Sequence, residues 1–217
     1  MNEKKRELGF YNCVVKRIID FVLAALILIV LSPILLILVL AIKLDSPGPV
    51  LFSQKRIGAG KTTFPIYKFR TMRIDTPHDV PTHMLKDPNQ YITRVGRFLR
   101  LTSLDELPQL WNILVGQMSF VGPRPALWNQ DDLIAARDKY RANAVRPGLT
   151  GWAQINGRDE LEIPVKARLD GEYVQRLSFG FDLKCFFGTF GYVFARKGVV
   201  EGGTGELHRQ DGEDTTK

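Results

Sequence analysis

The sequence predicts an α+β protein in which a long apolar helix precedes a small, mostly helical domain with a short β-hairpin. Three observations support this fold class. An apolar run covers residues 18–42, two short segments of alternating residues flank a glycine-rich turn, and apolar residues after position 90 have helical spacing. The chain has 217 residues, of which 45% are hydrophobic, which is enough for one packed domain and a membrane segment.

The apolar run has 25 residues, and Asp20 is its only charged side chain. As a helix it extends roughly 37 Å, which is enough to cross a bilayer with some tilt. It is too long for a cleaved signal peptide, and no small-residue cleavage site follows it. We therefore predict membrane attachment, and we exclude nucleic acid as a partner because a nucleic-acid-binding protein has no use for such a segment.

The direction of this run in the membrane is left open by the residues themselves. Ser32-Pro33 lies near its middle, where a proline removes one backbone hydrogen bond and disfavours a straight helix. Basic residues flank the run on both sides, so the positive-inside rule gives no direction. A kinked helix that returns to the same leaflet satisfies both observations. The alternative is a spanning helix with a tolerated proline.

The formal charge of +7 is unevenly distributed. Residues 201–217 hold 2 basic and 5 acidic side chains; removing them from the totals of 30 and 23 leaves 28 and 18, or about +10 for the rest. This excess favours anionic lipids or phosphorylated substrates. Cys13 and Cys185 have no metal-ligand spacing and indicate a reducing compartment. The acidic tail at 201–217 is predicted to be disordered.

Two short strands are predicted after the apolar run, at 50–54 and 64–69, around a turn at 58–61. In the second strand, a period of two places rings on one face and cations on the other. The rings are Tyr67 and Phe69, and the cations are Lys68 and Arg70. His78 and His83 lie in the next loop, and we interpret them as solvated residues, with zinc binding as the alternative.

Asp105 and Glu106 are adjacent carboxylates at the predicted start of a helix, and a row of arginines precedes them. The row consists of Arg94, Arg97 and Arg100, on one side of a helix predicted at 91–101. Phosphate chemistry needs a carboxylate that attacks phosphorus or binds Mg²⁺, and cations that hold the phosphates. The structural alternative is a capping box formed by Ser103 and Glu106, in which the acidic pair complements the helix dipole.

The region after the acidic pair is predicted to contain a core-facing helix and two rigid loops. The core face consists of Leu104, Leu107, Leu110, Trp111 and Leu114. Arg124 lies between two prolines and therefore has little conformational freedom, which suits a side chain that meets a ligand. Arg146 lies in the second rigid loop. The aromatic segment 178–196 lies either at the membrane interface or in the core.

Taken together, these motifs resemble those of the bacterial sugar transferase family, the monotopic phosphoglycosyl transferases that start glycan assembly on a polyprenyl carrier. The resemblance extends from about Lys16 to Val200, and the chain resembles the small form of the family, particularly members of capsule and O-glycan pathways. Seven motifs carry it in order: Lys16-Arg17-x-x-Asp20, Ser32-Pro33, Asp45-Ser46-Pro47-Gly48-Pro49, Tyr67-Lys68-Phe69-Arg70-Thr71-Met72, Asp105-Glu106-Leu107-Pro108-Gln109, Val121-Gly122-Pro123-Arg124-Pro125 and Arg146-Pro147-Gly148-Leu149-Thr150-Gly151.

The resemblance implies an interfacial segment at 1–15, a re-entrant membrane helix at 16–44 kinked at Ser32-Pro33, and a catalytic domain at 45–200 with interfacial amphipathic helices. This domain would face the cytoplasm at the bacterial inner membrane. The resemblance also implies a two-step reaction. Asp105 would attack the β-phosphate of a UDP-sugar, release UMP and form a covalent aspartyl-phosphosugar intermediate. Polyprenyl (undecaprenyl) phosphate would then accept the sugar phosphate.

The same resemblance implies that Glu106, with Asp105, binds Mg²⁺. Candidates for holding phosphates, including that of the lipid, are Lys68, Arg70 and Arg100, and candidates for the nucleotide are Arg124 and Arg146. Expected partners are a UDP-sugar, polyprenyl phosphate, membrane lipids and downstream glycosyltransferases of capsule, exopolysaccharide or glycoprotein glycan assembly. The residues identify neither the sugar nor a homodimer. Two alternatives remain: a one-step transferase in which the acidic pair only binds Mg²⁺, and a non-catalytic membrane scaffold for glycan enzymes.

Overall fold

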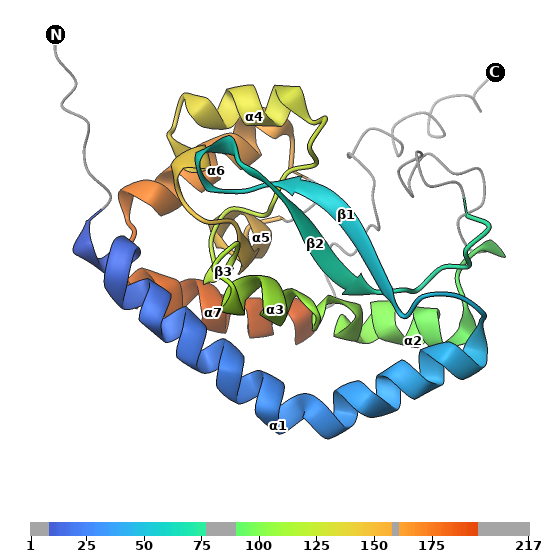
Figure 1. Cartoon of the computed structure of the whole chain (residues 1–217). Helices are drawn as coiled ribbons and strands as arrows, with labels where there is room; N and C mark the ends of the chain where they lie inside the picture. Colours follow the sequence, from blue (N-terminus) through green and yellow to red (C-terminus); the bar gives the residue numbers. More distant parts are fainter. Residues whose placement is uncertain (1–8, 77–89, 158–160, 195–217) are drawn as a thin grey trace, which may run out of the picture.

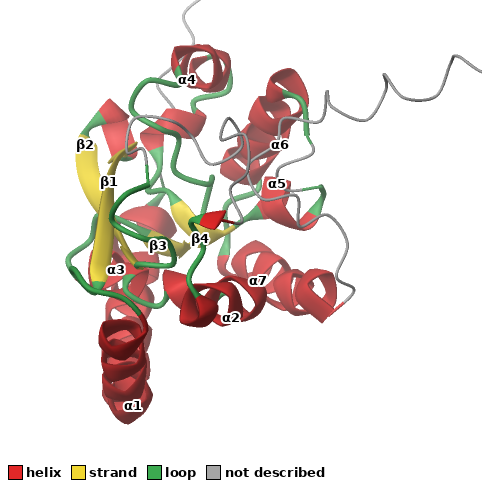
Figure 2. Cartoon of the chain, turned by 90° about the vertical axis from the view of Figure 1, so that its right-hand side faces the viewer, coloured by secondary structure: helices red, strands yellow, loops and turns green. Residues whose placement is uncertain are grey.

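A computed structural model describes residues 9–76, 90–157 and 161–194 of the chain (Figure 1). One long helix, α1 (Lys16–Asp45), accompanies short helices and two sheets of two strands each, which confirms the mixed helix-and-sheet class. In Figure 1 the helices α2 (Arg94–Thr102), α3 (Gln109–Leu114) and α7 (Phe179–Phe194) lie above α1, and Figure 2 shows α3 directly above it with α2 and α7 to one side. α1 therefore lies along one side of the domain and is not enclosed by it.

The apolar run forms one continuous helix with a bend near its middle (Figure 1). A π-helical turn, η1 (Tyr11–Val15), extends it to 35 residues, long and apolar enough to cross a membrane by length and composition. Pro33 lies inside the helix and has no N–H for the carbonyl of Ile29. The Ser32 hydroxyl donates to that carbonyl at 2.8 Å instead. Ser32 thus supplies the hydrogen bond that Pro33 removes, and the helix bends without ending.

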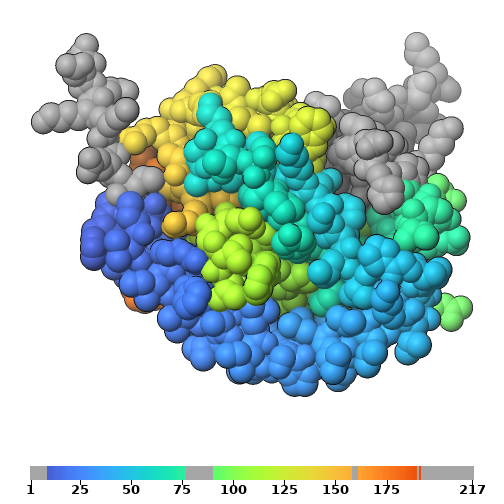
Figure 3. All heavy atoms as spheres, viewed as in Figure 1, coloured from blue at the N-terminus to red at the C-terminus, as the bar shows by residue number. Residues whose placement is uncertain are grey.

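Each limb of α1 packs against the domain through a separate apolar cluster. In the first limb, the fully buried Ala24 joins side chains of the hairpin, of α3 and of the segment after α3: Phe64, Ile66, Leu110, Ile113 and Met118. In the second limb, Leu38 and Ile42 pack with Phe69 and Leu99. Near the bend, Ile29 and Val30 are each 70% exposed. Figure 3 shows α1, in blue, along the whole lower edge of this face. The domain therefore covers one face of each limb, and the apolar residues at the bend and along the outer face of the helix stay exposed.

The predicted hairpin is confirmed, with a longer first strand than expected. β1 (Leu51–Ile57) pairs antiparallel with β2 (Thr63–Phe69) in a register that runs from Leu51 opposite Phe69 to Ile57 opposite Thr63. A short 3₁₀ turn, η2 (Ala59–Lys61), joins them. Phe64 and Ile66 face the first limb of α1, whereas Phe69 faces the second. The hairpin is thus fixed to both limbs.

The second sheet, which the sequence did not predict, holds the two arginine-bearing loops together. β3 (Ser119–Val121) pairs parallel with β4 (Gly148–Thr150). A Cβ atom on Gly148 would lie 2.1 Å from the backbone nitrogen of Gly122, so this backbone approach requires glycine. Further elements complete the domain: α4 (Asp131–Asp138), η6 (Ala142–Ala144), α5 (Trp152–Ile155) and α6 (Ile163–Gln175).

The aromatic C-terminal segment packs in the core on one face, as one of the two alternatives predicted, and its other face is exposed. One face of α7 is buried through Phe181 and Cys185, next to Tyr173. On its other face, Phe179 and Phe187 are 52% and 64% exposed. The prediction of Trp111 as a core residue was wrong: it is 53% exposed, whereas Ile113 is fully buried in its place. The helix begins only at Gln109, which rotates the buried face away from Trp111.

Candidate active site

The acidic pair lies in a 3₁₀ turn, η5 (Leu104–Glu106), between α2 and α3. Ser103 ends α2 in the left-handed region, with φ of 55°, and its side chain makes no capping hydrogen bond. The capping-box alternative was therefore wrong, and the pair precedes the α-helix instead of starting it. Pro108, at the N-cap of α3, has no N–H to donate, which fits the break between the 3₁₀ turn and the helix.

Two cations from distant parts of the chain converge on the acidic pair. Lys68 Nζ lies 2.8 Å from Glu106 Oε1 and 3.6 Å from Asp105 Oδ2. Arg124 Nη2 lies 3.2 Å from the same Glu106 oxygen. The side chains of Asp105 and Glu106 are 13% and 14% exposed. The hairpin and the first proline-bounded loop thus meet at a turn whose carboxylates are largely withdrawn from water.

The two carboxylates differ in how tightly they are held. Glu106 accepts direct hydrogen bonds from Lys68 and Arg124, whereas the contact of Asp105 with Lys68 is longer. Burial raises the pKa of the Asp105 carboxyl above its usual value, the negative charge of Glu106 raises it further, and Lys68 and Arg100 oppose that rise. A carboxylate that is poorly solvated and loosely paired is a better nucleophile than one fixed by two cations.

Asn112 positions Lys68, a role that sequence reasoning missed. This buried side chain accepts a hydrogen bond from Tyr67 N through Oδ1, and its Nδ2 donates to the carbonyl of Pro65. Both partners lie in β2, immediately before Lys68. Asn112 therefore fixes the strand that carries the cation to the helix that follows the carboxylates. The only sign in the sequence is an asparagine in an otherwise apolar helix, which is too common to be diagnostic.

The other two arginines predicted to hold phosphates occupy different positions. Arg100 lies close enough to influence Asp105 electrostatically, and its Nε donates to Thr71 Oγ1 at 2.9 Å. Arg70 is buried, and its guanidinium donates to the carbonyls of Ser46 and Pro47 after the end of α1. Arg70 therefore holds the end of the membrane helix, and no carboxylate of the acidic pair is among its hydrogen-bond partners.

Arg146 lies apart from the acidic pair. Its Nε donates to the carbonyl of Gly116, just beyond the opposite end of α3, and it lines a surface hollow of about 350 Å³. The other lining residues are Ala59, Thr62, Thr63, Phe64, Gly116 and Gln117. Lys68 lies five positions after Thr63 in β2, a rise of about 16 Å along the strand. The loop of Arg124 thus reaches the carboxylates, while the side chain of Arg146 does not join them.

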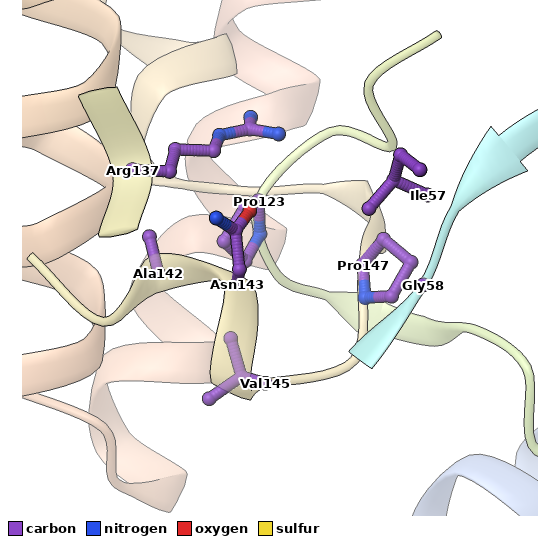
Figure 4. A pocket seen from close by; sticks show the side chains of 8 residues that line it. All are labelled: Ile57, Gly58, Pro123, Arg137, Ala142, Asn143, Val145 and Pro147. Carbon is purple, nitrogen blue, oxygen red and sulfur yellow. The ribbon is translucent and has the colours of Figure 1, made fainter. Parts of the chain in front are cut away.

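A second hollow lies between the hairpin turn and the helical part of the domain (Figure 4). Its lining residues are Ile57, Gly58, Pro123, Arg137, Ala142, Asn143, Val145 and Pro147. The cavity measures about 10 Å³, which is room for roughly one water molecule. It is therefore too small for a nucleotide, and the acidic turn with its two cations remains the candidate site.

The acidic pair is suited to Mg²⁺ but not to a metal held by protein alone. Within the described ranges, no group of three or more histidine, cysteine, aspartate or glutamate side chains could hold an ion. Mg²⁺ commonly uses one or two carboxylates and takes its other ligands from substrate phosphates and water. Two adjacent carboxylates, with Lys68 and Arg124 beside them, meet the carboxylate part of that requirement. His78 and His83, the alternative zinc ligands, lie outside the described residues.

Comparisons with known proteins identify the family to which this fold and site belong. A profile described as "Bacterial sugar transferase" matches residues 11–196. This chain belongs to the bacterial sugar transferase family. The matched span includes α1, the acidic pair and both arginine loops, so the family resemblance found in the motifs is confirmed.

Named relatives of the family align with most of this chain. "UDP-glucose:undecaprenyl-phosphate glucose-1-phosphate transferase" of Caulobacter vibrioides is 47% identical, over 80% of this chain and 67% of that protein. The Escherichia coli protein of the same name is 43% identical, over 86% of this chain. "Exopolysaccharide production protein PSS" of Rhizobium leguminosarum is 42% identical, over 82% of this chain and 94% of that protein. The chain spans 41% of the length of the E. coli relative.

Proposed function

We propose that this protein transfers a sugar-1-phosphate from a UDP-sugar to polyprenyl phosphate, with UMP as the other product. The observation that carries the proposal is the buried acidic turn, where one carboxylate is fixed by two cations and its neighbour is loosely paired. The family match and the names of its relatives support the same reaction class. Because two of these names contain UDP-glucose, UDP-glucose is the first donor to test.

In the first step, an Asp105 oxygen forms a bond to the β-phosphorus of the donor. The bond from that phosphorus to the bridging oxygen breaks, and UMP leaves with that oxygen. In the second step, a phosphate oxygen of polyprenyl phosphate attacks the same phosphorus, and the bond to Asp105 breaks, which restores the carboxylate. Asp105 attacks as a carboxylate, so this step requires no proton to be removed from the nucleophile.

The surrounding residues supply charge and orientation. Lys68 and Arg124 hold Glu106 and can contact the diphosphate, and Arg100 adds positive charge near Asp105. Asp105 and Glu106 would hold Mg²⁺ together with phosphate oxygens, and the ion would offset negative charge on the diphosphate. Arg146, at the other end of α3, remains a candidate for contact with a distant part of the nucleotide.

The arrangement of α1 supports a re-entrant helix in the bacterial cytoplasmic membrane. Lys16, near one end of the helix, pairs with Asp182 at 2.6 Å, and Asp45, at the other end, accepts a hydrogen bond from Val95 N. Both ends thus contact one domain, while the uncovered middle is apolar. A helix that crossed the bilayer would place its two ends on opposite sides, and one domain could not bind both. The catalytic domain would face the cytoplasm, where UDP-sugars are found.

The test is UMP release by protein in nanodiscs, with Mg²⁺ and UDP-glucose or other UDP-sugars, with and without undecaprenyl phosphate. We expect turnover only with lipid, and one equivalent of UMP per protein without it. Asp105→Asn should abolish both, whereas Asp75→Asn, at an exposed aspartate outside the site, should leave both intact. Absence of turnover in folded wild-type protein across the donor panel would contradict the proposal.

The same experiment separates the two-step reaction from its one-step alternative. In a direct transfer, the acidic pair only binds Mg²⁺ and both substrates must be present before UMP leaves. Lipid-dependent turnover without any UMP burst would therefore favour the direct route. Labelled sugar phosphate trapped on wild-type protein, but not on Asp105→Asn, would favour the covalent route.

A further inference from the structure

The motif Lys16-Arg17-x-x-Asp20 lies in the first turns of α1, and the proposed reaction assigns it no role. All three side chains point to the domain. Lys16 Nζ lies 2.6 Å from Asp182 Oδ2 in α7, and both side chains are less than 10% exposed. The other two residues contact elements that adjoin the acidic site, namely α3, which follows the acidic pair, and β3, which precedes the Arg124 loop.

Arg17 binds the end of the helix that follows the acidic pair. Its Nη1 donates to the carbonyl of Ile113 at 2.8 Å, and its Nη2 donates to the carbonyl of Leu114 at 2.7 Å. Gly116, with φ of 86°, follows these carbonyls, and a Cβ there would lie 3.2 Å from the Arg17 guanidinium. The planar guanidinium thus binds two last-turn carbonyls, where the helix dipole favours a cation.

Asp20 holds the strand that leads to the other side of the site. Its carboxylate is 2% exposed, and its Oδ1 accepts a hydrogen bond from Phe120 N at 3.1 Å. Phe120 lies in β3, four residues before Arg124, which pairs with Glu106. Arg17 and Asp20, one turn apart on the same helix, therefore fix the end of α3 and the start of the Arg124 loop to each other.

The far limb of α1 provides a comparison. Lys43 is also a basic residue that donates to a backbone carbonyl, that of Gly48 at 3.0 Å. Its contact is exposed, and its partner lies in the turn after α1, not in an element that carries Asp105 or Arg124. The two limbs thus differ: only the first has a basic residue that binds the end of α3.

We propose that Arg17 is a positioning residue for the transfer reaction, and that the membrane helix sets the geometry of the acidic site as well as anchoring the protein. Arg17 fixes α3, and through it Asp105, while Asp20 fixes the Arg124 loop against Glu106. This inference rests on the proposed function. It requires that loss of the Arg17 contact lower turnover without releasing the protein from the membrane, because the apolar part of α1 is unchanged.

The kinetic test compares wild type with Arg17→Gln, Arg17→Lys and the matched control Lys43→Gln in nanodiscs, with the donor found active for wild type. Arg17→Gln should lower kcat roughly 10²-fold while KM for the UDP-sugar changes little, since a displacement of about 1 Å costs that much. Arg17→Lys should recover part of the loss, because lysine keeps the charge but not the two-pronged geometry. Lys43→Gln should match wild type, and all variants should remain in the membrane fraction.

A second measurement does not depend on turnover. The chain has 3 tryptophans, and Trp111 lies in α3. In protein labelled with 5-fluorotryptophan, the ¹⁹F signal of Trp111, assigned by Trp111→Phe, should shift in Arg17→Gln and stay in place in Lys43→Gln. If no form turns over but this shift occurs, the proposed function fails, whereas the structural part of the inference, that Arg17 fixes α3, stands.

Two results would overturn the inference: wild-type kcat in Arg17→Gln, or an unmoved Trp111 signal in that variant. If Arg17→Gln does not fold, Asp20 carries the test. Asp20→Asn keeps an oxygen that can accept from Phe120 N, whereas Asp20→Ala does not. We expect a lower kcat for Asp20→Ala than for Asp20→Asn, and equal values would reject the positioning role.

Discussion

At the scale of single residues, the site depends on an asymmetry between two neighbouring carboxylates. Glu106 receives Lys68 and Arg124 directly, while Asp105 is buried with a longer contact to Lys68. Burial without full pairing makes the ionised form of Asp105 costly in the folded protein. The same cost that destabilises the fold makes the group reactive, and it leads to two predictions.

The first prediction concerns stability. The pKa of Asp105 is higher in the folded than in the unfolded chain, so its ionisation lowers stability as pH rises above the ordinary value of 3.8. Asp105→Asn should therefore melt at a higher temperature than wild type at pH 7, and the difference should shrink as pH falls and vanish below pH 3.8. Asp138 is the control of opposite sign, because hydrogen bonds from Lys61 and Asn143 lower its pKa. Asp138→Asn should melt at a slightly lower temperature than wild type at pH 7. If Asp105→Asn also melts at a lower temperature than wild type, the raised pKa assigned to Asp105 is wrong.

The second prediction concerns Lys68. Its positive charge lowers the pKa of Asp105, so its removal should raise that pKa further. Lys68→Gln should reduce kcat by about 10²-fold, the usual effect of losing one electrostatic contact, and move the acidic limb of the pH–rate profile to higher pH. Lys61→Gln, which removes an exposed lysine paired with Asp138, is the control. If the acidic limb of the pH–rate profile stays in place in Lys68→Gln, that limb does not reflect the ionisation of Asp105.

At the scale of elements, α1 packs against the domain on one face and exposes apolar side chains, proposed to enter the membrane, on the other. Its limbs pack in two different apolar clusters, and apolar residues at its bend, Ile29 and Val30, are each 70% exposed. Ser32 lowers the free-energy cost of this bend, because its hydroxyl donates to the Ile29 carbonyl, for which Pro33 has no N–H. The helix therefore continues through the bend at Pro33.

The third prediction tests the direction of α1. In a Cys13→Ser background, Gly9→Cys and Pro49→Cys place thiols just outside the two ends of the helix. A re-entrant helix predicts that a membrane-impermeant maleimide labels both from the cytoplasmic side only. Val30→Cys, 70% exposed in the protein but surrounded by lipid, should resist labelling from either side. Labelling of the two ends from opposite sides would demonstrate a spanning helix.

At the scale of the whole molecule, two kinds of force could hold the protein on a membrane. The basic surface attracts anionic lipid, and salt screens this attraction within about 10 Å at 0.1 M. The uncovered face of α1 and the exposed side of α7 contribute apolar contacts, which salt does not weaken. The size of the apolar face indicates that the second force dominates.

The fourth prediction follows from that balance. Washing membranes with 1 M salt should leave the protein in the pellet, whereas detergent should release it, as measured by sedimentation and immunoblotting. A triple variant with Ile29, Val30 and Ile37 changed to glutamine should partition partly into the soluble fraction. Release of wild-type protein by salt alone would mean that charge, not α1, is the anchor.

Much of the fold followed from local patterns. The apolar run, the hairpin and the arginine-rich helix α2 appear close to their predicted bounds, because each rests on a period or a turn that neighbouring residues determine. The start of α3 was misplaced, since the conformation of Ser103 and the position of Pro108 shorten the helix. The β3–β4 pair was missed because three-residue strands have no periodicity, and their pairing depends on glycines far apart in the chain.

By itself, the sequence determined that this is a membrane-attached α+β protein with an acidic pair suited to phosphate transfer, because hydropathy and motif order are properties of the linear chain. Only the tertiary structure decided which cations reach that pair. Lys68 and Arg124 do, whereas Arg70 turns to the end of α1 and Arg146 to the end of α3. A side chain's partner depends on which elements pack against each other, and these contacts join residues that lie up to about 40 positions apart.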